Sequence, residues 1–146
     1  MITKKPHGNK RRNSKMENQK LFETFETKGN LCTLQDVTAF ADIPWSKHPS
    51  FEGVELKHIV TGAQTEGAFS YHLVRIAPNC KIGHHVHKEQ LETHEVIAGN
   101  GTLINNGQSF AYEPGIISIL PKNIPHEVAA GDNGLYLFAK FMPALN

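Results

Sequence analysis

The chain has 146 residues, enough for a single hydrophobic core and too few for two, so we expect one folded domain. Its two cysteines, Cys32 and Cys80, are too few and too far apart to predict a disulfide scaffold or a thiolate metal site, which favours a reducing compartment. No apolar run approaches the ~20 residues that cross a bilayer, and no apolar signal stretch follows the basic N-terminus. We therefore expect a cytoplasmic protein with no membrane partner.

Positive charge is concentrated at the N-terminus. The remaining 131 residues carry nine basic and 14 acidic side chains, a net charge of −5 within a total of +1. Because residues 1–15 contain almost nothing apolar, they predict a disordered tail, and we do not expect nucleic acid as a partner. The six basic residues of this tail, which has no acidic residue, are Lys4, Lys5, Lys10, Arg11, Arg12 and Lys15.

Two regions follow the tail. In residues 16–49, Leu21, Phe22 and Phe25 have a weak helical spacing, so we expect a short helix within residues 17–28 in an extension that packs on the main domain. In residues 50–146, short apolar or alternating runs are interrupted by Gly, Pro and Asn, which predicts an all-β sandwich or barrel. The expected strands cover residues 54–61, 69–77, 84–87, 92–98, 102–105, 109–113, 116–120, 126–130 and 135–142.

Turn-forming residues separate these expected strands. Glycine and asparagine at residues 99–101 and 131–134 accept the positive φ angles of tight turns. Asn106-Gly107 lies between two apolar runs and is the strongest hairpin signal in the chain. No linker divides residues 30–146, so the strands are expected to belong to one domain.

Three histidines and a glutamate have a spacing typical of a metal site. His85 and His87 are separated by one residue, so in a strand they project to the same side. Glu92 opens the next expected strand and shares its side with His94, while His126 opens a later strand after a proline-containing turn. If the shared side is the barrel interior, three imidazoles and a carboxylate converge there, a set that binds divalent transition ions well.

These segments resemble the two motifs of the cupin family, G-x5-H-x-H-x3,4-E-x6-G and G-x5-P-x-G-x2-H-x3-N. In this chain the first motif reads Asn79-x5-His85-x-His87-x4-Glu92-x6-Gly99. Asparagine stands where the family has its first glycine, and asparagine is the residue that most readily replaces glycine at positive φ. All three ligand positions of this motif are intact.

The second motif reads Gly115-x5-Pro121-x-Asn123-x2-His126. Asn123 again stands at a glycine position, and Ala130 replaces the final asparagine of the family pattern. The departures affect loop geometry and the contacts around the ligands rather than the ligands themselves. The resemblance covers roughly residues 50–142.

By this resemblance the fold is a small jelly-roll barrel, or double-stranded β-helix, preceded by a short N-terminal helix or a disordered basic tail. The ion is expected near the wider mouth of the barrel, bound by His85, His87, Glu92 and His126. The expected cofactor is one divalent transition metal ion, Fe, Mn, Zn, Ni or Cu, because imidazole suits all five and no thiolate ligand is present.

A catalytic acid or base is less well defined by the sequence. His94, Tyr71 and Arg75 are candidates, with His72 and Tyr112 as further ones, and His94 is expected to contact a ligand residue or line the pocket rather than bind the ion. Tyr71 and Arg75 share one side of their strand and His72 the other, and alternation does not say which side lines the pocket. An inward arginine would favour an anionic substrate.

Two functional hypotheses follow from the resemblance. The first is a metal-dependent enzyme acting on a small organic molecule, with a mononuclear non-haem oxygenase or a related cupin isomerase or decarboxylase as the expected class. The second is a non-catalytic, metal-dependent module that binds or senses a small molecule. Family analogy also predicts a homodimer, formed through edge strands or the outward side of one sheet.

Overall fold

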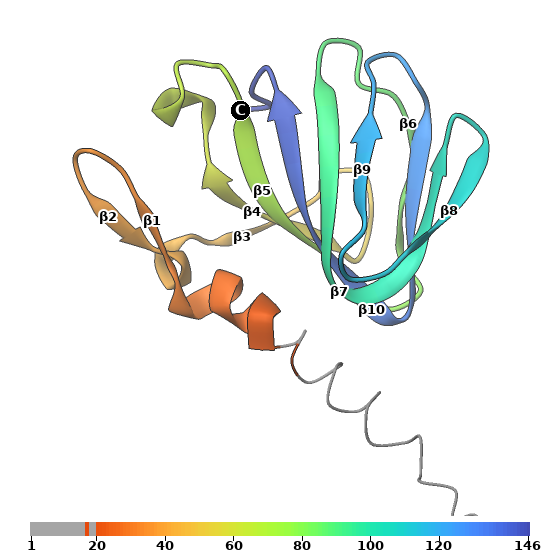
Figure 1. Cartoon of the computed structure of the whole chain (residues 1–146), viewed down its shortest axis with the longest axis horizontal. Coiled ribbons are helices and arrows are strands. Elements are labelled where there is room, and N and C mark those ends of the chain that lie inside the picture. The colour runs from red at the N-terminus through yellow and green to blue at the C-terminus, as the bar shows by residue number, and fades with distance from the viewer. Residues whose placement is uncertain (1–16, 18–19) are drawn as a thin grey trace, which may run out of the picture.

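The computed structural model describes residue 17 and residues 20–146, so the basic segment 1–15 lies outside the described residues. Figure 1 shows antiparallel strands that curve around a common interior, with the N-terminal segment on the outside. The expected all-β jelly-roll fold is confirmed. None of the helices in the described part of the chain is long and apolar enough to span a bilayer.

The main sheet contains eight strands and is antiparallel throughout. Its hydrogen-bonded path runs in the order β3, β4, β5, β10, β7 and β8, while β6 pairs with β10 and β9 pairs with β7. The strands are β3 (Trp45–Lys47), β4 (Val54–Val60), β5 (Ser70–Ile76), β6 (Lys81–His85), β7 (Leu91–Asn105), β8 (Gln108–Tyr112), β9 (Ile117–Leu120) and β10 (His126–Met142).

The N-terminal segment forms small elements of its own. After an α-helical turn at residues 20–23, a π-helical turn η1 (Thr24–Lys28) ends at Gly29, so the helix expected within residues 17–28 is present where the chain is described. A two-stranded sheet of β1 (Asn30–Cys32) and β2 (Val37–Ala39) follows, and it was not expected from the sequence. The remaining elements are the 3-10 turns η2 (Phe40–Asp42) and η3 (Gly62–Gln64).

Two hydrophobic clusters lie on opposite faces of the sheet. Inside the barrel, Val74, Leu137 and Phe141 belong to a core of fully buried side chains. On the outer face, Phe22 of the N-terminal segment packs with Leu73 and other side chains of the sheet. Both faces of β5 are therefore buried, one by the barrel interior and one by the N-terminal segment.

Two pairs of expected strands are in fact single long strands. The glycines at residues 99–101 lie within β7 and those at residues 131–134 within β10, although both segments were expected to break the chain. The pairing of β7 with β10 shifts register between Ala130 and Leu135, which marks an irregularity rather than a turn. A Cβ atom at Gly99 would clash with the carbonyl oxygen of Gly134, so these glycines permit a close backbone approach between two bent strands.

The expected turn chemistry is confirmed at three asparagines. Asn106 and Gly107 have φ angles of 49° and 76° and join β7 to β8 in a tight hairpin. Asn79 and Asn123, which occupy the glycine positions of the two motifs, have φ angles of 60° and 61°. Asparagine thus supports the left-handed conformation that each motif requires.

Candidate metal centre

The four expected ligands come from three strands and one loop. His85 ends β6, and it lies directly opposite His126, the first residue of β10. Glu92 is the second residue of β7. The strand expected to run through His87 ends two residues earlier, so His87 lies in the following loop. The backbone N–H of Asn123 donates to the carbonyl oxygen of His87 at 2.9 Å, which ties this loop to the turn before β10.

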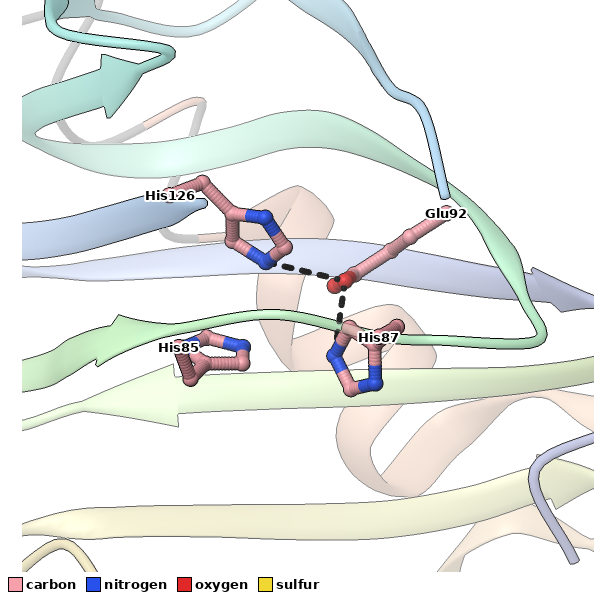
Figure 2. Close-up of side chains that lie close together, drawn as sticks. All are labelled: His85, His87, Glu92 and His126. Atoms are coloured by element: carbon pink, nitrogen blue, oxygen red, sulfur yellow. Dashed lines mark ion pairs between the residues drawn. The ribbon is translucent and has the colours of Figure 1, made fainter. Parts of the chain in front are cut away.

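The four side chains converge on one point, as Figure 2 shows. One nitrogen from each of the three imidazoles and one carboxylate oxygen lie within 4.8 Å of one another, so this cluster could hold a metal ion. The Nε2 atoms of His87 and His126 are 3.2 and 3.3 Å from Oε2 of Glu92. Three imidazole nitrogens and one carboxylate oxygen form a donor set that fits a divalent transition ion.

Backbone carbonyls fix the orientation of two rings. Nδ1 of His85 lies 2.7 Å from the carbonyl oxygen of Gly83, and Nδ1 of His126 lies 3.3 Å from that of Ile124. Because a carbonyl oxygen only accepts hydrogen bonds, each Nδ1 must carry a proton and donate. In a neutral imidazole this leaves the lone pair on Nε2, the atom that faces Glu92 in His126.

Burial and charge prepare the cluster for a cation. Oε2 of Glu92 and Nε2 of His126 are buried and make no hydrogen bond within the described part of the chain. Burial opposes ionisation of Glu92, but the surrounding imidazoles, His94 foremost, hold its pKa well below the usual value. Burial also lowers the pKa of His85, which favours the neutral form that can bind a metal. Two buried atoms without a partner, facing each other, therefore fit an ion between them.

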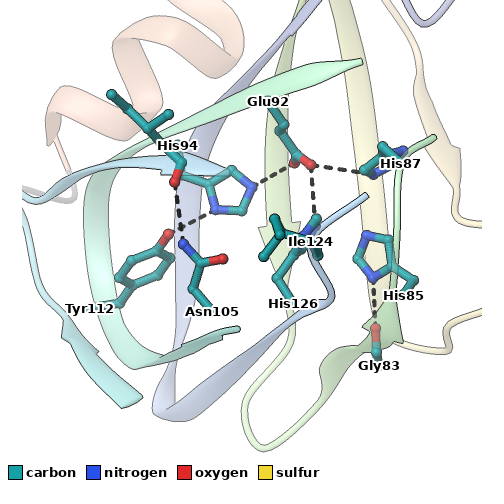
Figure 3. A network of polar contacts seen from close by, with 10 residues as sticks. Gly83, His85, His87, Glu92, His94, Asn105, Tyr112, Ile124 and His126 are labelled. Atoms are coloured by element: carbon teal, nitrogen blue, oxygen red, sulfur yellow. Dashed lines mark hydrogen bonds and ion pairs between the residues drawn. The ribbon is translucent and has the colours of Figure 1, made fainter. Parts of the chain in front are cut away.

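His94 contacts the carboxylate of Glu92 on the side away from the three imidazoles, and Tyr112 contacts His94. Nε2 of His94 lies 2.6 Å from Oε1 of Glu92, and its Nδ1 lies 2.8 Å from the hydroxyl of Tyr112. Figure 3 shows this chain of contacts running from the cluster into the barrel wall. Both residues are fully buried. His94 thus contacts one carboxylate oxygen of Glu92 while the other faces the three imidazoles.

A cavity of about 300 Å³ opens beside the cluster. The four candidate ligands and His94 form its polar end, and the barrel interior forms an apolar wall. No motif includes His48 or Leu145, yet both line this cavity. His48 lies in the segment before β4 and Leu145 in the segment after β10. Their positions at the cavity depend on tertiary folding, so they have no local sequence signal.

The remaining sequence candidates lie elsewhere. The hydroxyl of Tyr71 is 3.4 Å from Glu95 and its ring stacks on Phe138, on the outer face of the sheet. Arg75 also lies on that face and forms ion pairs with Glu26 and Glu55. The structure therefore does not bring Tyr71 or Arg75 to the cluster.

The other side of β5 carries His72 into the interior. His72 is fully buried, with Nδ1 2.8 Å from Nδ1 of His58 and Nε2 2.8 Å from the hydroxyl oxygen of Ser70. Its ring packs against Phe141, and Phe141 in turn packs against His87. The ring of Phe141 thus separates His72 from the cluster.

Comparisons with known proteins agree with this architecture. Residues 72–138 match the cupin domain family. A search of curated proteins finds no significant match. Among solved structures, a predicted oxalate decarboxylase from Thermotoga maritima has a TM-score of 0.64 at 19% identity, and the alignment covers 70% of this chain and 95% of that one.

Two further structures have similar scores. An RmlC-like cupin from Shewanella frigidimarina has a TM-score of 0.63 at 12% identity, covering 83% of this chain and 96% of that one. The polyketide cyclase RemF from Streptomyces resistomycificus has a TM-score of 0.60 at 18% identity, covering 70% and 74%. At these identities the similarity establishes the fold and not an activity. Together with the family match and the barrel topology, it shows that the chain contains a domain of the cupin superfamily.

Proposed function

We propose that the chain binds one divalent transition metal ion through His85, His87, Glu92 and His126 and acts as a metal-dependent enzyme on a small organic molecule. The observation that carries this proposal is the pair of buried, unpartnered atoms, Oε2 of Glu92 and Nε2 of His126, at the end of a cavity. A polar atom buried without a partner is costly, and an ion bound between these atoms would remove that cost.

The ion would provide a Lewis acid or, as Fe(II), a centre for reaction with dioxygen. Four protein ligands would leave coordination positions on such an ion for substrate and co-substrate, which supports a dioxygenase-like reaction. The protein supplies the fixed ring orientations of His85 and His126 and a cavity with a largely apolar wall. Fe, Mn, Zn, Ni and Cu all remain compatible with this donor set.

The alternative is a non-catalytic module that binds or senses a small molecule through the same ion. One observation favours it: the titratable groups that line the cavity are the four candidate ligands, His94 and His48. His94 is engaged by Glu92 and Tyr112, and Nδ1 of His48 accepts the backbone N–H of Ser50 at 3.1 Å. Within the described residues, a group free to transfer protons is therefore hard to identify.

Elemental analysis of protein purified without added metal tests the proposed site and identifies its ion. We expect about one transition metal ion per chain, lost in His85→Ala and His126→Ala. His84→Ala is the matched control, because His84 is the exposed neighbour of His85 and points away from the cluster. Metal-free wild-type protein that also fails to take up added Fe(II), Mn(II) or Zn(II) would exclude the proposed function.

Oxygen consumption distinguishes the enzyme from the binding module. The Fe(II)-loaded protein is mixed with small phenols, diketones and acids, and oxygen uptake above that of the His126→Ala variant supports an oxygenase. Saturable binding of one of these compounds without turnover supports the binding module instead.

A homodimer in the cytoplasm is the proposed assembly and location. Ile117 and Ile119 of β9 are 71% and 64% exposed on the outward side of the sheet, which supports pairing of two copies there. Free Cys32 and Cys80 support a reducing compartment. Light scattering of wild type and of an Ile117→Glu, Ile119→Glu double variant tests the dimer.

A further inference from the structure

Among its described lining residues, the cavity beside the proposed metal ligands has none of the basic side chains expected of a site that binds acids. Apart from the proposed ligands, its wall is dominated by apolar side chains of the barrel interior. Among the described residues that line it there is no lysine or arginine. The apolar side chains of this wall include Leu56, Val74, Leu137, Ala139, Phe141 and Leu145.

The basic side chains of the adjacent strands are engaged on the other face of the sheet. Arg75 of β5 pairs with Glu26 and Glu55, and its guanidinium lies 4.0 Å from the ring centre of Trp45. Lys57 of β4 donates to the backbone carbonyl oxygens of Glu26 and Phe40, both at 2.6 Å. Both cations are committed to the N-terminal segment and cannot neutralise an anion inside the barrel.

We propose that this site takes a small molecule that is uncharged when free, with oxygen donors for the ion and apolar groups for the wall, and that it discriminates against dicarboxylates. This inference rests on the proposed function. A carboxylate bound at the ion would place further charged oxygen atoms against Val74, Leu137 and Phe141, and the lining offers no lysine or arginine to compensate their desolvation. Apart from the proposed ligands and His94, its polar side chains are those of His48 and Ser50. Methyl or methylene groups in the same positions would gain contacts instead.

The cavity volume limits the size of the ligand. About 300 Å³ lies at the lower end of the ~300–1,000 Å³ found for small-molecule sites. His48 and Leu145 line the cavity, and Leu145 is 40% exposed, which places it at the rim. A compact ligand bound between the proposed metal ligands and Leu145 is therefore favoured over an extended chain or a polymer.

Acetylacetone and malonate form a matched pair of probes for this inference. They have equal numbers of non-hydrogen atoms and chelate a metal ion through two oxygen atoms in a six-membered ring. Acetylacetone, uncharged when free, releases one proton to solvent and binds as its enolate, whereas malonate binds as a dianion and carries two further oxygens where acetylacetone carries two methyl groups. Isothermal titration calorimetry of the zinc-loaded protein gives both affinities. We expect the preference for acetylacetone to exceed the preference of the aqueous zinc ion at the same pH by at least tenfold. An equal or reversed preference would overturn the inference.

A charge placed at the rim tests the cause of the selectivity. Leu145→Lys introduces a cation at a half-exposed position, and we expect it to reduce the preference for acetylacetone several-fold. Leu34→Lys is the control, because Leu34 is fully exposed between β1 and β2, and it should leave the preference unchanged. An unchanged preference in Leu145→Lys would also overturn the inference.

The two proposals fail in different ways. If the wild-type protein is metal-free and takes up neither Fe(II), Mn(II) nor Zn(II), the proposed function fails and the inference fails with it. If zinc is retained and malonate binds as well as acetylacetone, only the inference on ligand chemistry is overturned.

Discussion

Nε2 of His94 lies 2.6 Å from Oε1 of Glu92, on the side of the carboxylate that faces away from His87 and His126. An ionised carboxylate only accepts hydrogen bonds, so His94 is the donor in this contact. The hydroxyl of Tyr112, 2.8 Å from Nδ1 of His94, completes the support on the other side of the ring. One oxygen of Glu92 is thereby occupied, and the other is directed to the three imidazoles.

Replacing His94 should weaken metal binding without removing a ligand. Because contacts of this kind typically contribute 10- to 100-fold to metal affinity, we expect His94→Leu to raise the zinc dissociation constant within that range. His94→Gln retains a donor near Glu92 and should recover part of the loss. Competition with a chromophoric zinc chelator measures the affinities. Identical affinities for wild type and His94→Leu would show that His94 does not position Glu92.

The Tyr112→Phe variant separates positioning from packing. It removes only the hydroxyl that contacts His94, and Tyr112 is fully buried, so the aromatic packing is preserved. We expect a smaller loss of zinc affinity than in His94→Leu. Circular dichroism of each variant shows whether the barrel remains folded.

Burial of His72 should make the metal-free protein less stable in mild acid. Desolvation lowers the pKa of His72 to about 4, from 6.5 in the unfolded chain. Between these two values the unfolded state binds a proton that the folded state does not, so stability decreases as the pH falls from about 6.5 towards 4. The full effect corresponds to about 3 kcal/mol, and it is absent above pH 7.

Urea denaturation in the presence of a chelator measures this dependence. We expect His72→Leu to show a shallower decrease of stability between pH 7 and pH 4.5 than the wild type. The slope need not vanish, because burial also lowers the pKa values of His48, His58 and His85. His84→Leu is the exposed control and should retain the wild-type slope. An equal slope in His72→Leu and wild type would contradict the assignment.

The buried lysine of β4 should stabilise the N-terminal segment. Lys57 is 2% exposed, and its ammonium group joins the carbonyl oxygens of Glu26 and Phe40 to the outer face of the barrel. Lys57→Met keeps the aliphatic packing but leaves two carbonyl groups without their donor, at a cost of roughly 2–4 kcal/mol. Lys47→Met, at an exposed position of β3, is the control.

Equilibrium unfolding and metal content together identify the role of Lys57. We expect a lower free energy of unfolding and an unchanged zinc affinity, because Lys57 contacts the outer face and not the cavity. A loss of zinc binding in folded Lys57→Met protein would argue against this division between the two faces.

The sequence predicts some parts of this architecture well because their signals are local. The hairpin at Asn106-Gly107 and the positive φ angles of Asn79 and Asn123 depend on the conformational preferences of single residues. Strand alternation likewise predicts that Glu92 and His94 share one side of their strand, and both are buried on β7. The spacing of short apolar runs and turns predicted an all-β sandwich or barrel, and the jelly-roll was implied by the family resemblance.

Other parts depend on tertiary contacts that alternation cannot encode. Alternation groups Tyr71 with Arg75 and separates them from His72, but it does not say which group faces inward. A solvent-exposed outer face would have settled the question, yet the N-terminal segment packs on β5, so apolar side chains are buried on both of its faces. Likewise, Gly99 reads as a break because the sequence does not show that Gly134 lies against it.

Gly99 lies against the backbone of Gly134, whereas Gly107 has a similar φ angle in open surroundings. Gly99 has a φ angle of +79°, and a Cβ atom there would clash with the carbonyl oxygen of Gly134. Gly107 has a similar φ angle of +76°, but a Cβ atom would meet nothing within 4 Å. Alanine at either position carries the conformational penalty of roughly 1–2 kcal/mol, whereas only Gly99→Ala also forces β7 and β10 apart.

We therefore expect Gly99→Ala to destabilise the protein clearly more than Gly107→Ala in urea denaturation. The difference between the two variants isolates the steric contribution, because the φ angles are nearly equal. β10 also carries His126, and β7 carries Glu92, so separation of these strands should weaken zinc binding in folded Gly99→Ala protein but not in Gly107→Ala. Equal stabilities would mean that the paired strands adjust around a methyl group, and that the glycines serve only the backbone angle.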